Sequence, residues 1–337
     1  MLDGDNADLR HRMKAFFSAD SLYIPRYDID LRDDRELAYQ RLSKFCRAGF
    51  VSVADFAADP RRIFAAHEVA ALVDPSMATK MTVQFNLFGG TVLKLDGSAR
   101  HHQVLRKIDD ATAFGCFCLT ECGYGNNAVE METTATLVPA GAGGGSSSSP
   151  FEFEIHSPTT LSAKYWITNG AVHAQWAVVF ARLLLPASGG GRPRDEGVHA
   201  FLVRIRDDDT MAPMPGVRID DMGHRIGCNG VDNAKIAFDR VRVPLSALLD
   251  AHSRVSADGA FSSSVARPRD RFLRVADQLL SGEWFASDGR DHAVAGKGAI
   301  LRAGRSAAEN SRPPPSEKKT KKNNPPKPKQ AASASLP

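Results

Sequence analysis

The sequence lacks an apolar run long enough to cross a bilayer, a span that needs about 20 residues. Its longest apolar run, Ala177–Pro186, is much shorter and contains Arg182. The N-terminus, which begins Met1-Leu2-Asp3, is acidic and has no apolar segment of the kind found in secretory signals. We therefore expect neither a membrane span nor a secretory signal.

Cysteine is sparse, and its number is odd, at five in 337 residues. Such a set does not form a disulfide framework, and it favours a reducing compartment. The cluster Cys116-x-Cys118-x₃-Cys122 does not have the usual spacing of zinc ligands. We expect two small apolar residues on one face of a strand and a third in a turn, with no metal.

Net charge is also small, at +4 for 43 basic and 39 acidic residues, and it is unevenly distributed. Residues 304–337 contain eight basic and two acidic residues, which leaves about −2 for the rest of the chain. The run Lys318–Lys322 has no interleaved aromatic residues, so it does not indicate a nucleic-acid interface. The composition of this tail, rich in Pro, Lys and Ser, predicts disorder.

Hydrophobic periodicity divides the chain into a helical part and a β-rich part. Residues 1–112 have helical periodicity, for example in Asp33–Arg47 and after the cap Asp59-Pro60. From about Phe114 the period becomes two, and turn signals at this spacing favour a sandwich or barrel over βαβ units. The candidate strands are Phe114–Leu119, Thr133–Val138, Phe151–Ile155, Trp176–Leu184, Val198–Ile205 and Ala234–Phe238.

The predicted fold is therefore α+β. A helical domain over 1–112 precedes a β-barrel or sandwich domain over 113–250. Residues 251–284 begin a second helical region, and 285–337 form a disordered basic tail.

Local signals add detail to this division. Gly89-Gly90 predicts a break between helices, and Ser98–Asp109 predicts a further helix. The segment Gly141–Ser149 predicts an expanded hairpin tip, and Ser188–Arg194 predicts a loose loop.

Two segments place hydroxyl residues beside glycines at the ends of strand-like runs. They are Leu119–Asn127 and, some forty residues later, Lys164–Gly170. Small residues let the backbone approach a flat ligand closely, and a threonine hydroxyl can fix its orientation. Together the two segments predict a site for a flat polar ligand such as a flavin.

Short motifs occur in a recognisable order between about Ala66 and Gly282. They include Arg100-His101-His102, Gly115-Cys116-Phe117, Leu119-Thr120-Glu121, Glu132–Thr136, Lys164–Ile167, Gly197–Phe201, Gly223–Gly227, Gly230–Asn233 and Phe238–Pro244. In this order they resemble the acyl-CoA oxidases of the acyl-CoA dehydrogenase superfamily, and most closely the peroxisomal type.

The resemblance implies a helical domain, a central β-domain and C-terminal helical bundles, assembled as a homodimer in the intact family. It also implies FAD as cofactor, acyl-CoA as substrate and molecular oxygen as oxidant, in fatty acid β-oxidation. A carboxylate takes the α-proton of the acyl-CoA, and the β-hydrogen leaves as hydride to the flavin. The products are trans-2-enoyl-CoA and hydrogen peroxide.

The same resemblance implies particular site residues. The expected cofactor residues are Thr120, Gly123, Trp166 and Thr168, and the expected substrate-side residues are Gly125 and Asn126. Asn126 stands where many members have serine, and the alternative for Trp166 is a core aromatic.

Other polar residues in the motifs have less specific expectations. Glu121 is either a ligand contact or a structural residue, and Asp232-Asn233 predicts a β-turn. Capping or packing, rather than catalysis, is expected of His101, His102 and His224.

No catalytic base is assigned. The resemblance ends at about Glu283, before the region in which the family carries its glutamate, so we expect the C-terminal helical bundle to be missing from this chain. The alternative function is a catalytically inactive truncated remnant or a regulatory partner of a full-length oxidase. Peroxisomal localisation follows from the resemblance alone, because the chain ends Ala-Ser-Leu-Pro and not in a Ser-Lys-Leu type signal.

Overall fold

The computed structural model describes residues 4–125, 127–141, 149–187 and 191–276. All of them belong to one unit of the chain, Met1–Ser281. The predicted disorder over 285–337 lies outside the described residues, and so does most of the predicted hairpin tip.

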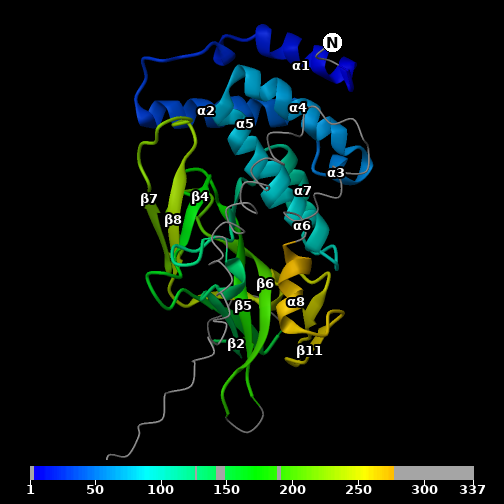
Figure 1. The fold of residues 1–337 in the computed structure, drawn as a ribbon, viewed down its shortest axis with the longest axis vertical. Coiled ribbons are helices and arrows are strands. Elements are labelled where there is room, and N and C mark those ends of the chain that lie inside the picture. Colours follow the sequence, from blue (N-terminus) through cyan, green and yellow to red (C-terminus); the bar gives the residue numbers. More distant parts are fainter. Residues whose placement is uncertain (1–3, 126, 142–148, 188–190, 277–337) are drawn as a thin grey trace, which may run out of the picture. The chain divides into compact units, whose positions relative to one another are not determined.

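Helices occupy the first part of the described chain, as the periodicity predicts (Figure 1). Aspartates begin several of them: the Asp59 carboxylate accepts a hydrogen bond from the N–H of Arg61, and Asp74 accepts from Ser76 and Met77. These contacts satisfy N–H groups that a helix start leaves without a partner. The bounds are α1 (Ala7–Ser18), η1 (Ser21–Tyr23), α2 (Leu31–Arg47), α3 (Asp55–Ala58), α4 (Pro60–Val73), α5 (Pro75–Met81), η2 (Thr82–Gly89), α6 (Gly90–Leu95) and α7 (His102–Asp109).

The predicted helix break at Gly89-Gly90 is wrong. The η2 segment is a π-helix that runs directly into α6, and both glycines have helical φ angles of −61° and −62°. Gly89 serves packing instead, because a Cβ there would lie 2.7 Å from Cγ2 of Val53. The helix expected from Ser98 begins later, at His102.

The strands form a curled mixed sheet and two smaller sheets. Strand β5 pairs antiparallel with β6 and parallel with both β1 and β2, and the larger sheet continues through β3 to β9. Strands β4, β8 and β7 make a separate antiparallel sheet. The bounds are β1 (Gly115–Cys118), β2 (Thr134–Pro139), β3 (Phe151–His156), β4 (Lys164–Thr168), β5 (Trp176–Leu185), β6 (Arg194–Arg204), β7 (Val217–Asp221), β8 (Asn233–Phe238), β9 (Val241–Pro244), β10 (Ser253–Val255) and β11 (Phe261–Ser263).

The α+β prediction is confirmed, with the β-rich part curled into a half-barrel. All six predicted strands form, and β4 lies in the segment described as a strand-like run. Strands β7, β9, β10 and β11 were not predicted, and β10 and β11 lie where the sequence was expected to begin a helical region. Strand β6 also begins at Arg194, inside the segment expected to be a loop. The strands that were not predicted have only three to five residues, too few for the alternation that predicts a strand.

Strand β5 joins the two hydrophobic cores because both of its faces are buried. Val178 and Phe180 point into a core shared with the helices, whereas Ala177, Val179 and Ala181 point into the core inside the curled sheet. Alternate residues of a strand face opposite sides. The helices therefore pack on one face of this strand, and the core inside the curled sheet covers its other face.

Helix α8 (Pro268–Val275) lies beside β6 (Figure 1). The Arg271 guanidinium forms a buried ion pair with Glu196 and donates to the Glu196 carbonyl at 2.7 Å. Gly197 has φ +83°, and a Cβ there would lie 2.3 Å from the carbonyl oxygen of Pro268. The close approach of helix and strand thus depends on glycine at this position.

Substitution of Gly115 by alanine should destabilise the chain by roughly 1–3 kcal/mol, the usual cost of overpacking a filled core. A Cβ at Gly115 would lie 2.1 Å from Cδ1 of Phe88, a fully buried ring in η2. Urea unfolding of both proteins measures the loss. Gly227→Ala is the control, because a Cβ there meets nothing within 4 Å. Equal unfolding free energies for wild type and Gly115→Ala would contradict the packing described.

Candidate functional site

The two glycine-containing segments lie side by side, although some forty residues separate them. The N–H of Tyr165 donates to the carbonyl of Thr120 at 2.9 Å, and the N–H of Cys122 donates to Ala163 at 3.0 Å. The N–H of Gly123 donates to the Leu161 carbonyl at 2.9 Å. The sequence therefore builds one surface from two distant segments.

An open hollow of about 340 Å³ lies on this surface. Three elements line it: η2, the residues at the end of β1, and β4. Three of the four predicted cofactor residues line the hollow, namely Thr120, Trp166 and Thr168. The other lining residues are Val83, Leu87, Phe117, Leu119, Tyr165 and Ile167.

An irregularity in β4 turns two aromatic side chains outward. The register with β8 shifts between Lys164 and Ile167, and Trp166 has φ +60°. Both Tyr165 and Trp166 are exposed as a result, Trp166 by 52%. A positive φ at a bulky residue is uncommon and costs free energy, and such residues cluster at ligand sites. The alternative that Trp166 is a core aromatic is wrong.

Thr168 ends β4 with its hydroxyl already engaged on one side. Its Oγ1 donates to Oδ1 of Asn233 at 3.1 Å. Because a hydroxyl has one hydrogen to donate, Thr168 can only accept a hydrogen bond from a ligand in the hollow.

The glycines of the first segment lie beside the hollow but do not line it. A Cβ at Gly123 would lie 2.7 Å from Cβ of Leu161, so this glycine permits the contact between the two segments. Gly125 has φ +49° with open space around it. Asn126, the other predicted substrate residue, lies outside the described residues.

Glu121 and Lys164 form a fully buried ion pair behind the hollow, with Nζ 3.0 Å from Oε1. Glu121 also accepts hydrogen bonds from the N–H groups of Glu132 and Thr133, and Lys164 donates to the carbonyl of Phe180 at 2.7 Å. Burial lowers the pKa of Lys164, and the Glu121 carboxylate opposes that shift. Glu121 was expected to be either a ligand contact or a structural residue. The geometry shows the structural role, because the ion pair joins the two glycine-containing segments.

The remaining motif residues lie elsewhere. Nε2 of His101 lies 2.9 Å from the Ser246 carbonyl, a packing contact of the expected kind. The predicted β-turn at Asp232-Asn233 is wrong, because Asn233 begins β8 and Asp232 is fully buried beside Lys80. Short-range turn statistics cannot reveal an ion partner 152 positions away.

The predicted positions of three cysteines are confirmed. Cys116 and Cys118 are buried on one face of β1, with Sγ atoms 3.8 Å apart, and Cys122 is exposed. Within the described ranges, no group of three or more His, Cys, Asp or Glu residues is placed to hold a metal ion.

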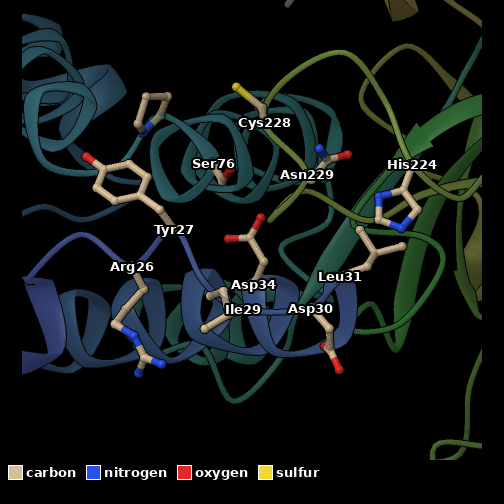
Figure 2. Close-up of a pocket in the computed structure, with 11 residues that line it drawn as sticks. Arg26, Tyr27, Ile29, Asp30, Leu31, Asp34, Ser76, His224, Cys228 and Asn229 are labelled. Atoms are coloured by element: carbon tan, nitrogen blue, oxygen red, sulfur yellow. The ribbon is translucent and has the colours of Figure 1, made fainter.

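A second, polar hollow of about 370 Å³ lies between α2, α5 and the loop that carries His224 and Cys228 (Figure 2). Figure 2 shows the Asp34 carboxylate beside Ser76 and Asn229. Burial raises the pKa of Asp34, and Asp74 adds to the shift. None of the predicted site residues that the structure describes lines this hollow, and His224, which lines it, does not line the hollow beside Trp166.

Comparison with known families agrees with this geometry. Residues 116–241 match the acyl-CoA dehydrogenase middle domain, and about four fifths of the chain is similar to peroxisomal acyl-CoA oxidases. No described helix is long and apolar enough to span a membrane.

Particular relatives define the extent of the match. The chain is 37% identical to acyl-coenzyme A oxidase 2 of Arabidopsis thaliana over 280 residues, which is 83% of this chain and 39% of the relative. It is 36% identical over 274 residues to human peroxisomal acyl-coenzyme A oxidase 3, covering 80% and 37% of the two chains. The structure of acyl-CoA oxidase 3 from Yarrowia lipolytica is similar with a TM-score of 0.64 at 26% identity, over 84% of this chain and 39% of that one. The chain thus spans about two fifths of these relatives' length.

Proposed function

We propose that this chain supplies one wall of an FAD site of the acyl-CoA oxidase type. The intact activity would convert acyl-CoA to trans-2-enoyl-CoA with oxygen as oxidant, in peroxisomal fatty acid β-oxidation. The observation that carries the proposal is the convergence of Thr120, Trp166 and Thr168 on one hollow from two segments distant in sequence.

The lining of the hollow suits an isoalloxazine ring. Val83, Leu87 and Phe117 offer apolar surface, and Trp166 offers an exposed aromatic side chain at the edge. Thr168 offers a hydrogen-bond acceptor, which matches an N–H of the ring. Bound FAD would supply hydride acceptance and electron transfer to oxygen. In support, the related acyl-CoA oxidase-2 of Caenorhabditis elegans has been crystallised with FAD.

The proposal assigns substrate neighbours but no catalytic base to this chain. We propose Gly125 and Asn126 as neighbours of acyl-CoA, and we assign no catalytic base among the described residues. The alternative is that the chain binds FAD without turnover and acts as a regulatory partner of a full-length oxidase. It would then associate with the oxidase as one subunit of a homodimer does with the other.

The direct test is FAD titration of the purified 337-residue chain, followed by a peroxide assay with an acyl-CoA. Bound flavin with peroxide formation supports the oxidase activity. Bound flavin without peroxide favours the regulatory alternative. A preparation that neither retains nor takes up FAD refutes the proposed site.

Thr168→Val should weaken FAD binding roughly 3- to 10-fold, since one neutral hydrogen bond contributes ~0.5–1.5 kcal/mol. The substitution keeps the side-chain shape and removes the hydroxyl. Thr136→Val is the matched control, because Thr136 lies in β2 outside the hollow. Fluorescence titration with FAD measures both. An unchanged affinity in Thr168→Val would remove this residue from the site.

A further inference from the structure

A buried charge cluster of Lys80, His173 and Asp232 lies behind the flavin-facing surface. Lys80 and Asp232 form an ion pair with both side chains fully buried. His173 completes the cluster: its Nδ1 lies 3.1 Å from Nζ of Lys80 and 3.3 Å from Oδ1 of Asp232. None of the three residues lines the hollow.

The cluster holds the turn that follows Thr168. The second carboxylate oxygen of Asp232 accepts the N–H of Val172 at 2.7 Å and that of His173 at 3.3 Å. The next residue, Asn233, accepts the Thr168 hydroxyl. Residues 232 and 233 therefore fasten both ends of the segment Thr168–His173.

Asn169, the second residue of the same segment, is held by hydrogen bonds of its own side chain. It is buried with φ +69°, and its side-chain amide donates to the carbonyls of Lys80 and Gly115, at 3.3 Å each. Asparagine adopts this left-handed conformation more readily than most residues, and the two side-chain hydrogen bonds hold it there. The cluster and Asn169 thus constrain one short turn from two sides.

The charge on Asp232 suits this role. Burial alone would raise the pKa of Asp232, but Lys80 and His173 reverse the effect and hold it well below its usual range. An ionised carboxylate only accepts hydrogen bonds, so both of its oxygens are available to N–H donors. Hydrogen bonds to a charged acceptor are stronger than neutral ones.

We propose that Lys80, His173 and Asp232 are positioning residues: they hold Thr168–His173 so that Trp166 and Thr168 are presented to the ligand before it binds. The purpose assigned to the cluster rests on the proposed function. The cluster itself touches no ligand, and it acts through the backbone of the turn.

Two matched double variants of the full chain separate the effect of the hydrogen bond from Val172 to Asp232 from the effect of the Lys80–Asp232 ion pair. Lys80→Met with Asp232→Asn removes both charges but keeps an oxygen that can accept the N–H of Val172. Lys80→Met with Asp232→Leu removes the charges and the acceptor, with a side chain that branches at Cγ as asparagine does. Hydrogen exchange measured by mass spectrometry then reports on peptides from residues 165–175, with β5 as an internal reference.

We expect exchange in the 165–175 peptides to rise on the order of 10- to 100-fold in the leucine variant, the range for loss of a hydrogen bond to a charged acceptor. The asparagine variant keeps only a neutral acceptor, so its exchange should rise less than that of the leucine variant, and β5 should be unchanged in both. FAD affinity and the bound flavin spectrum should change most in the leucine variant. Unchanged exchange in the leucine variant, or raised exchange with unchanged FAD binding, overturns the proposal.

Failure of the proposed function gives a different result, because the wild-type chain would then bind no FAD. The hydrogen-exchange comparison would still test whether Asp232 holds the N–H of Val172. If the leucine variant does not fold, residue-resolved exchange of wild type decides. Val172 is 40% exposed and lies in a turn, yet its N–H should be protected if Asp232 holds it. Exchange of that N–H at the rate of an unstructured peptide would refute the anchor.

Discussion

Replacing Glu121 with alanine should destabilise the chain by about 3–5 kcal/mol, the range observed when one partner of a buried ion pair is removed. Lys164 would remain fully buried without its counter-charge, and the N–H groups of Glu132 and Thr133 would lose their acceptor. Because the pair joins the two segments of the hollow, FAD binding should fall as well. Urea unfolding at pH 7 measures the loss of stability.

The pH dependence identifies the cause of that loss. Burial lowers the pKa of Lys164, and removal of the Glu121 carboxylate lowers it further. A lysine whose folded pKa lies below its unfolded value gains stability as pH rises, so the deficit of Glu121→Ala should shrink toward pH 10. Glu121→Gln with Lys164→Met should recover much of the stability, and Glu130→Ala is an exposed control nearby. A deficit under about 1 kcal/mol would contradict the burial of an uncompensated charge.

Acidification from pH 7 to 4 should cost roughly 3 kcal/mol of stability through His199 alone, at 1.36 kcal/mol per pH unit. Burial is the largest cause that lowers the pKa of His199; the hydrogen bond to the Gly197 carbonyl opposes it, the nearby Arg271 adds to it, and the net pKa is about 4. Nε2 of His199 is buried and has no hydrogen-bond partner among the described residues. Between about pH 6.5 and 4 the unfolded chain therefore binds a proton that the folded chain does not, and stability falls as pH falls.

A difference measurement isolates this contribution. Denaturant midpoints at several pH values for wild type and His199→Leu should show a flatter dependence in the variant between pH 6.5 and 4. Phe261→Leu is the packing control, because it changes the ring in edge contact with His199 at 6.0 Å and keeps the histidine. Its stability should be lower at every pH, with the wild-type slope. Parallel curves for wild type and His199→Leu would show that His199 takes up its proton equally in both states.

Much of the fold follows from local patterns in the sequence. Helical spacing over Asp33–Arg47 and the cap at Asp59-Pro60 predict α2 and α4, and alternation predicts β5 within one residue. These signals are local, because a side chain's position in the 3.6 or 2 residue period determines which face it shares with its near neighbours. The two glycine-containing segments were identified from hydroxyl residues beside glycines at the ends of strand-like runs, whereas the roles expected of their residues came from the resemblance to the acyl-CoA oxidases.

Tertiary structure alone decided the features that complete the site. Periodicity does not predict that η2 runs directly into α6 at Gly89-Gly90, because the dense packing of Gly89 against Val53 comes from a different part of the chain. Nor does it predict the outward turn of Trp166, which depends on a register shift against β8.

The charged residues illustrate the same division. By composition Lys80, Lys164, Glu121 and Asp232 read as surface residues, since lone charges are seldom buried. Their burial is tolerated because each has a partner of opposite charge. The partners are 43 and 152 positions apart in the sequence, so only the folded chain brings them within ion-pair distance. The sequence by itself determined the elements and the ancestry of the site, whereas long-range pairing of buried charges determined how the wall of the site is held.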